Sequence, residues 1–272
     1  MELAHPWLVA QTRRISPGSG LNVATAMPCA RPVRAAWSGH PQAHATPQQA
    51  SNVPAAAFFD LDRTLIRRSS VLALAGSFRK RGLISRVDLL KSAFWQVLFV
   101  LRGASAERVR VAAEDGMRIL DGFSVADMQE LVGDAMEPVL RPLVYDEPLH
   151  LVRQHRERGE RVYIVSATLQ EIVQHMADDL GFDGAIGSTC EIVDGVYTGR
   201  SLRAAHGAGK ADALRELARA EGLDLAASTA YSDSYSDVPF LEAVGHPVAA
   251  NPDRKLRRIA RERGWPVVDF AS

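Results

Sequence analysis

Short apolar runs, each followed by polar residues, recur along the chain from about residue 55 onward. The three clearest are residues 55–61 (AAAFFDL), 162–165 (VYIV) and 226–231 (AASTAY). Runs of this length are typical of strands that are buried on both faces of a parallel sheet. Three shorter runs are weaker strand candidates, at residues 185–186, 248–249 and 267–268.

Helical patterns lie between these runs. Residues 169–180 and 210–220 carry apolar side chains at helical spacing, and residues 252–263 begin after an Asn-Pro pair that is typical of a helix start. Strands that alternate with helices predict an α/β fold built on a doubly wound parallel sheet. Residues 190–199 (CEIVDGVYTG) place an Asp-Gly turn between two β-prone pieces and predict a small hairpin.

The alternation is interrupted between residues 69 and 145, where the pattern is almost wholly helical and predicts about four helices in a row. Because this insertion follows the first strand, we expect it to lie over the carboxyl ends of the strands, where α/β folds bind ligands. Its most apolar run, residues 89–101, is too short to cross a membrane and contains Lys91 and Gln96. It predicts a buried or docking helix.

Residues 1–53 are rich in Pro, Ala, Gln, Ser and Gly and predict a poorly ordered tail. The pair Arg13-Arg14 raises the alternative of a twin-arginine export signal, but no apolar segment follows it. A transit peptide would need stronger amphipathic periodicity. We favour an ordinary extension, or a start codon placed before the true one, for which Met27 is a candidate. The predicted organisation is a tail over residues 1–53, a core over residues 54–68 and 146–272, and a helical insertion over residues 69–145.

Composition and charge argue against several classes of function. Lys plus Arg and Asp plus Glu each number 32, so the formal net charge is zero, which argues against a general nucleic-acid binder. The two cysteines, Cys29 and Cys190, are too few for a disulfide framework or a cysteine-based zinc site. With no segment long enough to span a membrane, we expect a cytoplasmic protein. A homodimer is an open alternative to a monomer.

Polar residues with chemical potential follow the predicted strands. The first group is Asp60 and Asp62, within FDLDRT, which would point to the same side if the strand continued through them. Such a pair could share a divalent cation, or one acid could attack while the other handles protons. The alternative is a strand that ends in an Asx-type turn with both acids solvated.

The next two groups suit a phosphate. Ser166, with the backbone amide of Ala167, follows the second strong strand and would form an anion pocket at a helix N-terminus, unless the serine is only a helix cap. Lys210 follows a Gly-containing loop and could pair with a phosphate. Its alternative is a solvated side chain in the first turn of a helix, where the helix dipole disfavours a cation.

The last group is the run YSDSYSD at residues 231–237. Asp233 and Asp237 are four residues apart and would share one face if the turn continues into a helix. Their hard oxygen atoms suit magnesium better than zinc. The alternative is a capped loop in which Asp237 only opens the helix that follows.

Taken together and in this order, the four groups resemble the four motifs of the haloacid dehalogenase (HAD) superfamily. These are Asp-x-Asp-x-Thr, then a Ser or Thr after the second strand, a Lys, and an acidic pair after a later strand. The resemblance covers roughly residues 55–270. The helical insertion lies between the first two motifs, and the Ser166 to Lys210 spacing leaves no room for a second large one. This arrangement is similar to the phosphoserine-phosphatase-like branch with a helical cap (subfamily IB).

The resemblance implies a magnesium-dependent phosphatase that forms an aspartyl-phosphate. Asp60 would be the nucleophile, and Asp62 would protonate the leaving oxygen and then activate water. Ser166 and the Ala167 amide would hold the phosphoryl oxygens, and Lys210 would neutralise the charge that develops.

The resemblance also implies a magnesium site formed by Asp60, the backbone carbonyl of Asp62, and Asp233. Thr64 would orient the turn after the nucleophile, and Asp237 would support the metal site from behind. The substrate would be a small phosphorylated metabolite.

Two departures leave the substrate's identity open. Residue 63 is Arg where better-known members have Gly or Ser, and the fourth motif reads Ser-Asp-Ser-Tyr-Ser-Asp where phosphoserine phosphatases have Gly-Asp-Gly-x-x-Asp. Phosphotransfer to an acceptor other than water remains an alternative, as does a regulatory or partner-binding protein that uses the fold as a scaffold. A response-regulator receiver lacks the helical insertion, and a dehalogenase proper would not need Asp62.

Overall fold

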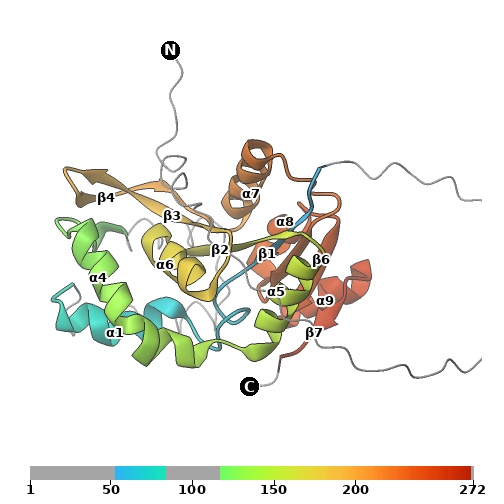
Figure 1. The fold of residues 1–272 in the computed structure, drawn as a ribbon, viewed down its shortest axis with the longest axis horizontal. Helices are drawn as coiled ribbons and strands as arrows, with labels where there is room; N and C mark the ends of the chain where they lie inside the picture. The colour runs from blue at the N-terminus through green and yellow to red at the C-terminus, as the bar shows by residue number, and fades with distance from the viewer. Residues whose placement is uncertain (1–52, 84–116, 271–272) are drawn as a thin grey trace, which may run out of the picture. The chain divides into compact units, whose positions relative to one another are not determined.

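The computed structural model describes residues 53–83 and 117–270 (Figure 1). Three predictions lie wholly or almost wholly outside the described residues: the tail up to residue 52, the two middle helices of the insertion up to residue 116, and the apolar run at residues 89–101. In the described part, no helix is long and apolar enough to cross a membrane.

Seven strands of the described residues form one sheet in the order β4-β3-β2-β1-β5-β6-β7 (Figure 1). Their bounds are Ala56–Phe59 (β1), Arg161–Leu169 (β2), Gly184–Val193 (β3), Val196–Arg203 (β4), Thr229–Ser232 (β5), His246–Ala250 (β6) and Val267–Val268 (β7). The order runs outward from β1 in both directions, as in a doubly wound sheet. The predicted fold class is confirmed.

The sheet departs from the prediction at one edge, where β4 pairs antiparallel with β3. The predicted hairpin at residues 190–199 is the turn end of this longer strand pair. Asp194 and Gly195 form its two-residue turn, and both have positive φ, 51° and 79°, as a type I′ turn requires. A turn this short can join only antiparallel strands, so the sheet is mixed.

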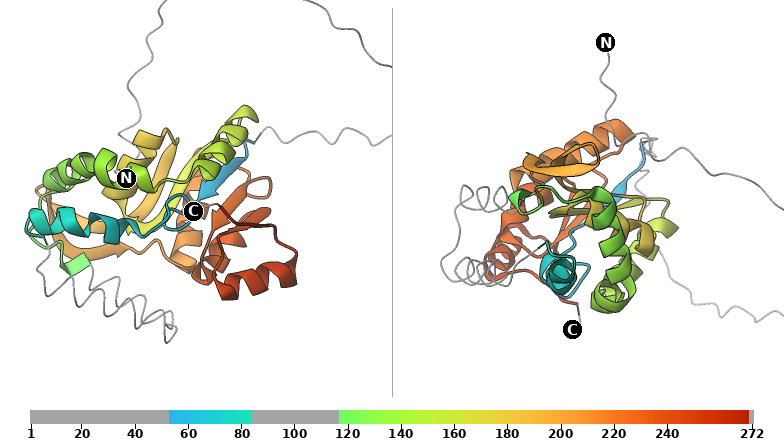
Figure 2. Two further views of the ribbon diagram at one scale, coloured as in Figure 1. Left: turned by 90° about the horizontal axis from the view of Figure 1, so that it is seen from below. Right: turned by 90° about the vertical axis from the view of Figure 1, so that its left-hand side faces the viewer.

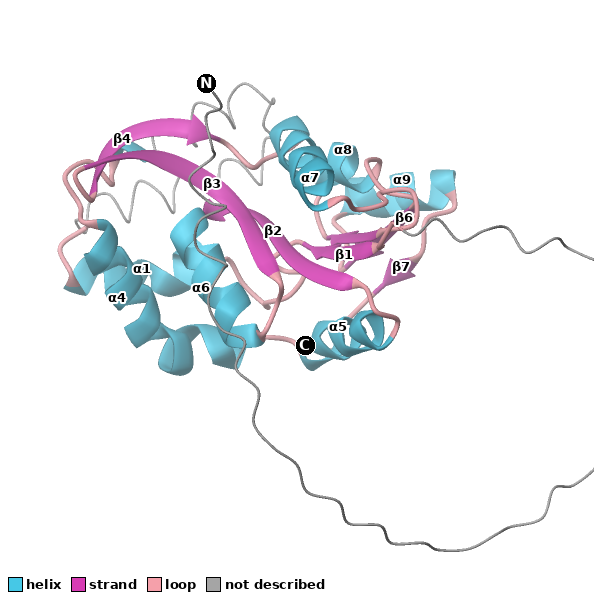
Figure 3. Ribbon diagram, turned by 45° about the horizontal axis from the view of Figure 1, so that its top comes forward, coloured by secondary structure: helices cyan, strands magenta, loops and turns pink. Residues whose placement is uncertain are grey.

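Helices cover both faces of the sheet, with α7 (Ala208–Glu221), α8 (Val238–Leu241) and α9 (Arg254–Arg263) on one side and α5 (Asp146–Glu157) and α6 (Gln170–Leu180) on the other (Figure 3). Strand β1 explains why two layers are needed. Ala57 and Phe59 point into the core beside α6, whereas Ala56 and Phe58 point into the core beside α7, and all four are fully buried. Alternation along a strand therefore sends apolar side chains into two cores.

The second predicted strong strand after the insertion, residues 226–231, begins later than its apolar run. Strand β5 starts at Thr229 because Asp224 organises a turn before it. The carboxylate of Asp224 accepts the amides of Ala226 and Ala227, at 2.9 and 3.3 Å, and the Ser228 hydroxyl donates to the Asp224 carbonyl at 2.5 Å. An Asx turn thus replaces the first part of the predicted strand.

The described part of the helical insertion contains α1 (Ser70–Lys80) and α4 (Val125–Ala135), followed by a π-helical turn (Met136–Leu140) and a 3-10 turn (Arg141–Leu143). Helices α1 and α4 lie side by side next to α6 (Figure 2). Leu74 and Leu131 belong to the same core cluster as Ile172 of α6. The insertion and the sheet thus share apolar packing, and the boundaries predicted between them stay a prediction.

The hairpin also binds the insertion through backbone hydrogen bonds. Gly122 donates to the carbonyl of Tyr197 and Tyr197 donates to that of Phe123, each at 2.9 Å, while Val125 donates to Gly195 at 2.9 Å. The segment that enters α4 therefore pairs with β4, which the sequence analysis did not predict.

Gly245 allows β6 to enter the sheet close to the turn before β5. A Cβ atom at this position would lie 1.8 Å from the carbonyl oxygen of Ala226, which is backbone and cannot move aside as a side chain would. We expect Gly245→Ala to lower the free energy of unfolding by roughly 2–4 kcal/mol. Urea denaturation measures this loss.

Gly76 is the matched control, because a Cβ there meets nothing within 4 Å. Gly76→Ala should leave the stability unchanged or raise it by up to about 1 kcal/mol through better helix propensity. Equal midpoints for the two variants would contradict the close approach at Gly245.

Candidate active site

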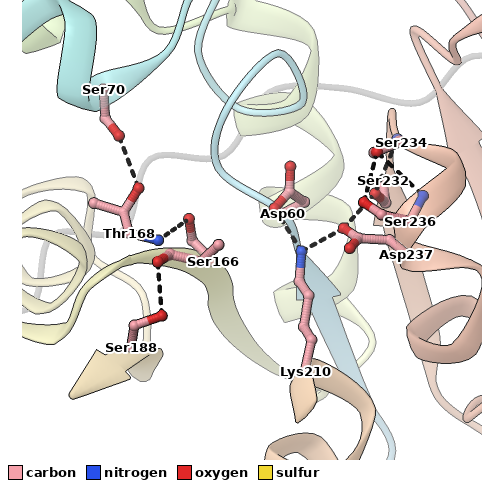
Figure 4. Close-up of polar contacts among 11 residues, drawn as sticks. Asp60, Ser70, Ser166, Thr168, Ser188, Lys210, Ser232, Ser234, Ser236 and Asp237 are labelled. Atoms are coloured by element: carbon pink, nitrogen blue, oxygen red, sulfur yellow. Dashed lines mark hydrogen bonds and ion pairs between the residues drawn. The ribbon is translucent and has the colours of Figure 1, made fainter. Parts of the chain in front are cut away.

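Two acids predicted to carry chemistry follow the carboxyl ends of adjacent strands, and Figure 4 shows the first of them, Asp60, at the end of β1. Asp60 comes directly after β1, and its amide donates to the carbonyl of Tyr231 on β5 at 2.9 Å. Asp233 comes directly after β5. Because β1 and β5 are neighbours in the sheet, the two acids emerge at the same edge, as the sequence analysis expected.

Lys210 stands at the centre of this site. Its ammonium donates to Asp60 Oδ1 at 2.5 Å and to Asp237 Oδ2 at 2.6 Å, and the residue is only 1% exposed. The ammonium also lies 4.7 Å from the ring centroid of Phe240, a cation–π contact. The alternative of a solvated Lys210 is therefore wrong, because packing of α7 and α8 encloses the side chain between two carboxylates.

Asp237 is held from two sides. It accepts from Lys210 and, at 2.8 Å, from the hydroxyl of Ser232. It precedes α8, yet its side chain makes no cap hydrogen bond to that helix. The alternative in which Asp237 serves only to open the helix is therefore wrong: its carboxylate fixes the ammonium of Lys210.

Asp62 does not follow the geometry expected of it. Strand β1 ends at Phe59, and the chain then turns so that the amides of Leu65 and Ile66 both donate to the carbonyl of Leu61. The alternation of a strand therefore does not apply to Asp62. Its carboxylate is half-buried and accepts the amide of Ser70 at 2.8 Å, at the start of α1. Asp62 thus joins the sheet edge to the helical insertion.

Ser166 belongs to a second group of contacts (Figure 4). It lies in the irregular end of β2, four residues before α6 begins, so the expected place at a helix N-terminus is wrong. The Ser166 hydroxyl accepts the amide of Thr168 at 3.1 Å, and the Thr168 hydroxyl bonds that of Ser70 at 3.0 Å. Ala167 is exposed, and its carbonyl accepts the Ser188 hydroxyl at 2.7 Å.

Thr64 is fully buried, and its hydroxyl has no hydrogen-bond partner among the described residues. The turn after Asp60 is held instead by the backbone bonds to Leu61. The orienting role expected of the Thr64 side chain stays a prediction.

Two supporting residues were not identified from the sequence. Buried His155 of α5 contacts Glu160 Oε2 at 2.5 Å and the hydroxyl of Tyr231 at 2.8 Å. Tyr231 is also the residue whose backbone carbonyl receives the Asp60 amide. Asn251 donates from Nδ2 to the carbonyl of Arg63 at 3.0 Å. The Asn-Pro-Asp turn was the available signal for Asn251; a lone histidine at a core position offers none.

Arg63 also contributes to the site. Its guanidinium Nε lies 3.4 Å from Asp233 Oδ2, and its side chain is 61% exposed. In the sequence alone, residue 63 stands out only as a departure from the family pattern.

The electrostatics of the site follow from its burial. Burial raises the pKa of Asp60 above its ordinary value, Lys210 opposes this, and the nearby charges of Asp237 and Asp233 add to it. Burial also raises the pKa of Asp233 to about 7, although the positive charge of Arg63 opposes the rise. Burial would lower the pKa of Lys210, but Asp237 and Asp60 outweigh it and raise that pKa. Three buried carboxylates share one buried ammonium, so further positive charge is favourable here.

The donor set fits magnesium. The described residues contain no group of three or more His, Cys, Asp or Glu side chains arranged to hold a metal ion. Mg²⁺, however, keeps several water ligands and commonly uses only one or two carboxylates. Asp60 and Asp233 supply two buried carboxylates at one sheet edge, and their negative charges favour a cation there.

Removing the buried ammonium should leave the repulsion among the buried carboxylates uncompensated. In Lys210→Met, the carboxylates of Asp60 and Asp237 lose their partner, so we expect the metal-free protein to lose about 3–5 kcal/mol of stability near neutral pH. The loss should shrink at about pH 5, because protonation removes the uncompensated charge. Urea denaturation at the two pH values measures it. The exposed Lys80→Met is the control, and a Lys210→Met protein as stable as wild type would contradict the buried ion cluster.

Asp233 should make the metal-free protein less stable as pH rises. Its pKa is raised to about 7 in the folded state, so the folded state binds its proton more tightly than the unfolded chain does. Stability is therefore lost as pH rises from about 4 through about 7. In Asp233→Asn this part of the dependence should vanish, while the part due to Asp60 remains. Denaturation in the presence of EDTA measures both proteins, and identical slopes would contradict the assignment.

Comparison with known proteins places this geometry in a family. Residues 57–242 match the family model described as haloacid dehalogenase-like hydrolase. A protein of Streptomyces azureus named "Inhibition of morphological differentiation protein" is 41% identical over 79% of this chain and 78% of its own length. Phosphoserine phosphatase SerB1 of Mycobacterium tuberculosis is 39% identical over 80% of this chain and 72% of its own.

Solved structures share the fold. A Bordetella pertussis protein of unknown function has a TM-score of 0.70 and 32% identity, covering 80% of this chain and 99% of that one. A phosphoserine phosphatase with an analogue of a phospho-aspartyl intermediate has a TM-score of 0.55 at 17% identity, covering 79% of this chain and 93% of that one. With a family model that spans most of the described sheet and relatives this similar, the chain belongs to the haloacid dehalogenase-like hydrolase family, and its neighbours include phosphoserine phosphatases.

Proposed function

We propose that this protein is a phosphatase that hydrolyses a small phosphate monoester, with magnesium as its cofactor and an aspartyl-phosphate as its intermediate. One observation supports this most strongly. A buried ammonium, Lys210, bridges Asp60 and Asp237 at 2.5 and 2.6 Å at the carboxyl edge of the sheet. It holds a carboxylate nucleophile in place and offers positive charge to an incoming phosphate.

The first half of the reaction transfers the phosphoryl group to Asp60. A carboxylate oxygen of Asp60 attacks phosphorus, and the bond between phosphorus and the ester oxygen breaks. Asp62 gives its proton to the departing oxygen, which leaves as an alcohol. Burial raises the pKa of Asp62 above its ordinary value, although hydrogen bonds from Ser70 oppose this. A carboxyl group that holds its proton more tightly suits a general acid.

The second half regenerates the enzyme. Asp62, now ionised, takes a proton from water, and the resulting hydroxide attacks phosphorus. The bond between phosphorus and Asp60 breaks, so that inorganic phosphate leaves and Asp60 is again a carboxylate. Because Asp62 accepts the amide at the start of α1, its position depends on the helical insertion.

Other residues bind and neutralise the phosphoryl group. Ser166 and the amide of Ala167 would hold its oxygens, and Lys210 would balance their charge. Asp60, Asp233 and the backbone carbonyl of Asp62 would hold Mg²⁺, which supplies further charge neutralisation when bound. Asp237 supports Lys210, and Thr64 lies in the intervening turn.

A regulatory role is compatible with this chemistry. The relative from Streptomyces azureus has a name that describes inhibition of differentiation, and a phosphatase can exert such an effect through the metabolite that it consumes. The retained cluster of Asp60, Lys210 and Asp237 favours catalysis over a scaffold without activity.

The test is hydrolysis of p-nitrophenyl phosphate and of a panel of phosphorylated metabolites, with and without magnesium. Asp60→Asn should lower kcat by at least about 10³-fold, because no covalent intermediate can form. Asp62→Asn should lower it by about 10²–10⁴-fold. Since p-nitrophenolate leaves without a proton, Asp62→Asn should also accumulate phosphorylated protein, which intact mass spectrometry detects.

Asp212→Asn is the control, because this acid of α7 pairs with Arg215 on the exposed surface. It should keep the wild-type rate. Folded wild type that hydrolyses no ester of the panel with magnesium, and forms no phosphorylated protein, would overturn the proposed function.

A further inference from the structure

Backbone strain in the described residues is concentrated beside the active site. Three residues other than glycine have positive φ in the described part of the chain: Arg63 at 64°, Asp194 at 51° and Asn251 at 46°. Asp194 is explained by the hairpin turn. The other two are bonded to each other, since Asn251 Nδ2 donates to the Arg63 carbonyl at 3.0 Å. A long side chain in this conformation costs free energy, so its placement calls for a functional reason.

The side chain of Arg63 supplies that reason. Its Nε lies 3.4 Å from Asp233 Oδ2, so an arginine at the mouth of the site pairs with a buried carboxylate. The Asp233 side chain is only 8% exposed, whereas that of Arg63 is 61% exposed. The ion pair therefore joins a buried carboxylate to an arginine side chain that is largely exposed to solvent.

Lys210 is bound differently. Its ammonium is committed to Asp60 and Asp237 and lies against Phe240, and its side chain is 2% exposed. It cannot leave without exposing two buried charges. Arg63 can leave Asp233 by rotating its side chain into solvent, because its backbone is anchored separately by Asn251.

We infer that Arg63 is an exchangeable counter-ion of Asp233 that competes with magnesium for this carboxylate, so that Arg63 lowers the metal affinity of the site. The inference rests on the proposed function, which makes Asp233 a ligand of Mg²⁺. A guanidinium and a divalent cation that approach one carboxylate repel each other, so each weakens the binding of the other. Arg63 thus stabilises Asp233 in the metal-free protein and weakens the apparent affinity for the metal.

The size of the effect follows from exposure. A half-exposed ion pair at this separation stabilises the metal-free protein only modestly. The remaining repulsion between Arg63 and the bound cation lowers the affinity for magnesium further. We expect Arg63→Gln, which keeps a Cβ and so the same backbone cost, to bind Mg²⁺ roughly three- to tenfold more tightly than wild type. Arg63→Lys keeps the charge, so its affinity should lie closer to wild type than to Arg63→Gln.

The experiment is a magnesium titration of the full chain at low ionic strength, read by calorimetry and by the rise in melting temperature on adding metal. Neither readout needs catalysis. Arg63→Gln should show a lower Kd and a larger metal-induced rise in Tm than wild type. Added NaCl should narrow the difference, because salt weakens the exposed pair.

Arg67→Gln is the matched control. Arg67 lies four positions along the same loop, but its contacts are the Pro142 carbonyl at 3.2 Å and the ring of Tyr145. This variant loses one positive charge without touching Asp233, so its affinity for magnesium should equal that of wild type.

Equal magnesium affinities of wild type and Arg63→Gln would overturn the inference. So would a gain of affinity in Arg67→Gln as large as that in Arg63→Gln, or the absence of magnesium binding in both wild type and Arg63→Gln. The proposed function fails on a different measurement, the loss of ester hydrolysis and of phosphorylated protein. A chain that binds magnesium in competition with Arg63 but hydrolyses nothing would thus support the inference and reject the function.

Discussion

The site depends on the two ion pairs that the buried ammonium of Lys210 forms. The ammonium stands between Asp60 and Asp237 with almost no access to water, and it joins α7 to the segments that follow β1 and β5. A buried charge of this kind is tolerable only when its partners are in place. The packing of α7 and α8 against the sheet and the arrangement of the acids therefore require each other. At this edge of the sheet, the same ion pairs fix the arrangement of the site and contribute to the stability of the fold.

The second constraint is the balance of charge. Asp60, Asp233 and Asp237 are all buried, and Lys210 compensates only part of their charge. Burial in a low-dielectric site makes an uncompensated carboxylate unfavourable, and it raises the pKa of Asp60 and of Asp233. Such a site attracts cations. Arg63 supplies positive charge from the exposed side. The donor set suits a hard divalent ion, so the Asp233 carboxylate would serve two positively charged partners in the function that we propose.

The helical insertion is coupled to the site by short polar contacts rather than by proximity alone. Asp62 accepts the amide at the start of α1, and Ser70 of α1 bonds Thr168 at the end of β2. The hairpin of β3 and β4 pairs with the segment that enters α4. A movement of the insertion would therefore be felt at Asp62 and next to Ser166. This gives the insertion a direct means of adjusting Asp62, the acid that we propose as the proton donor and acceptor.

The local sequence predicted the apolar strands, the helices between them, the hairpin turn at Asp194-Gly195 and the placement of Asp60 and Asp233 at strand ends. These features depend on neighbouring residues: periodicity, turn chemistry and the rule that parallel strands end at one edge. Motif order added the family, which the comparisons confirmed.

Tertiary structure decided the rest. Whether Lys210 is solvated or buried depends on Asp60, 150 positions away, and on how α7 and α8 pack. That Asp62 binds α1, that Ser166 lies within β2, and that Arg63 reaches Asp233 also depend on where separate segments meet. Burial and ion pairing are set by contacts between residues distant along the chain, and a local pattern carries no information about them. The sequence by itself therefore determined which residues gather at the sheet edge, and only packing decided how their charges are paired.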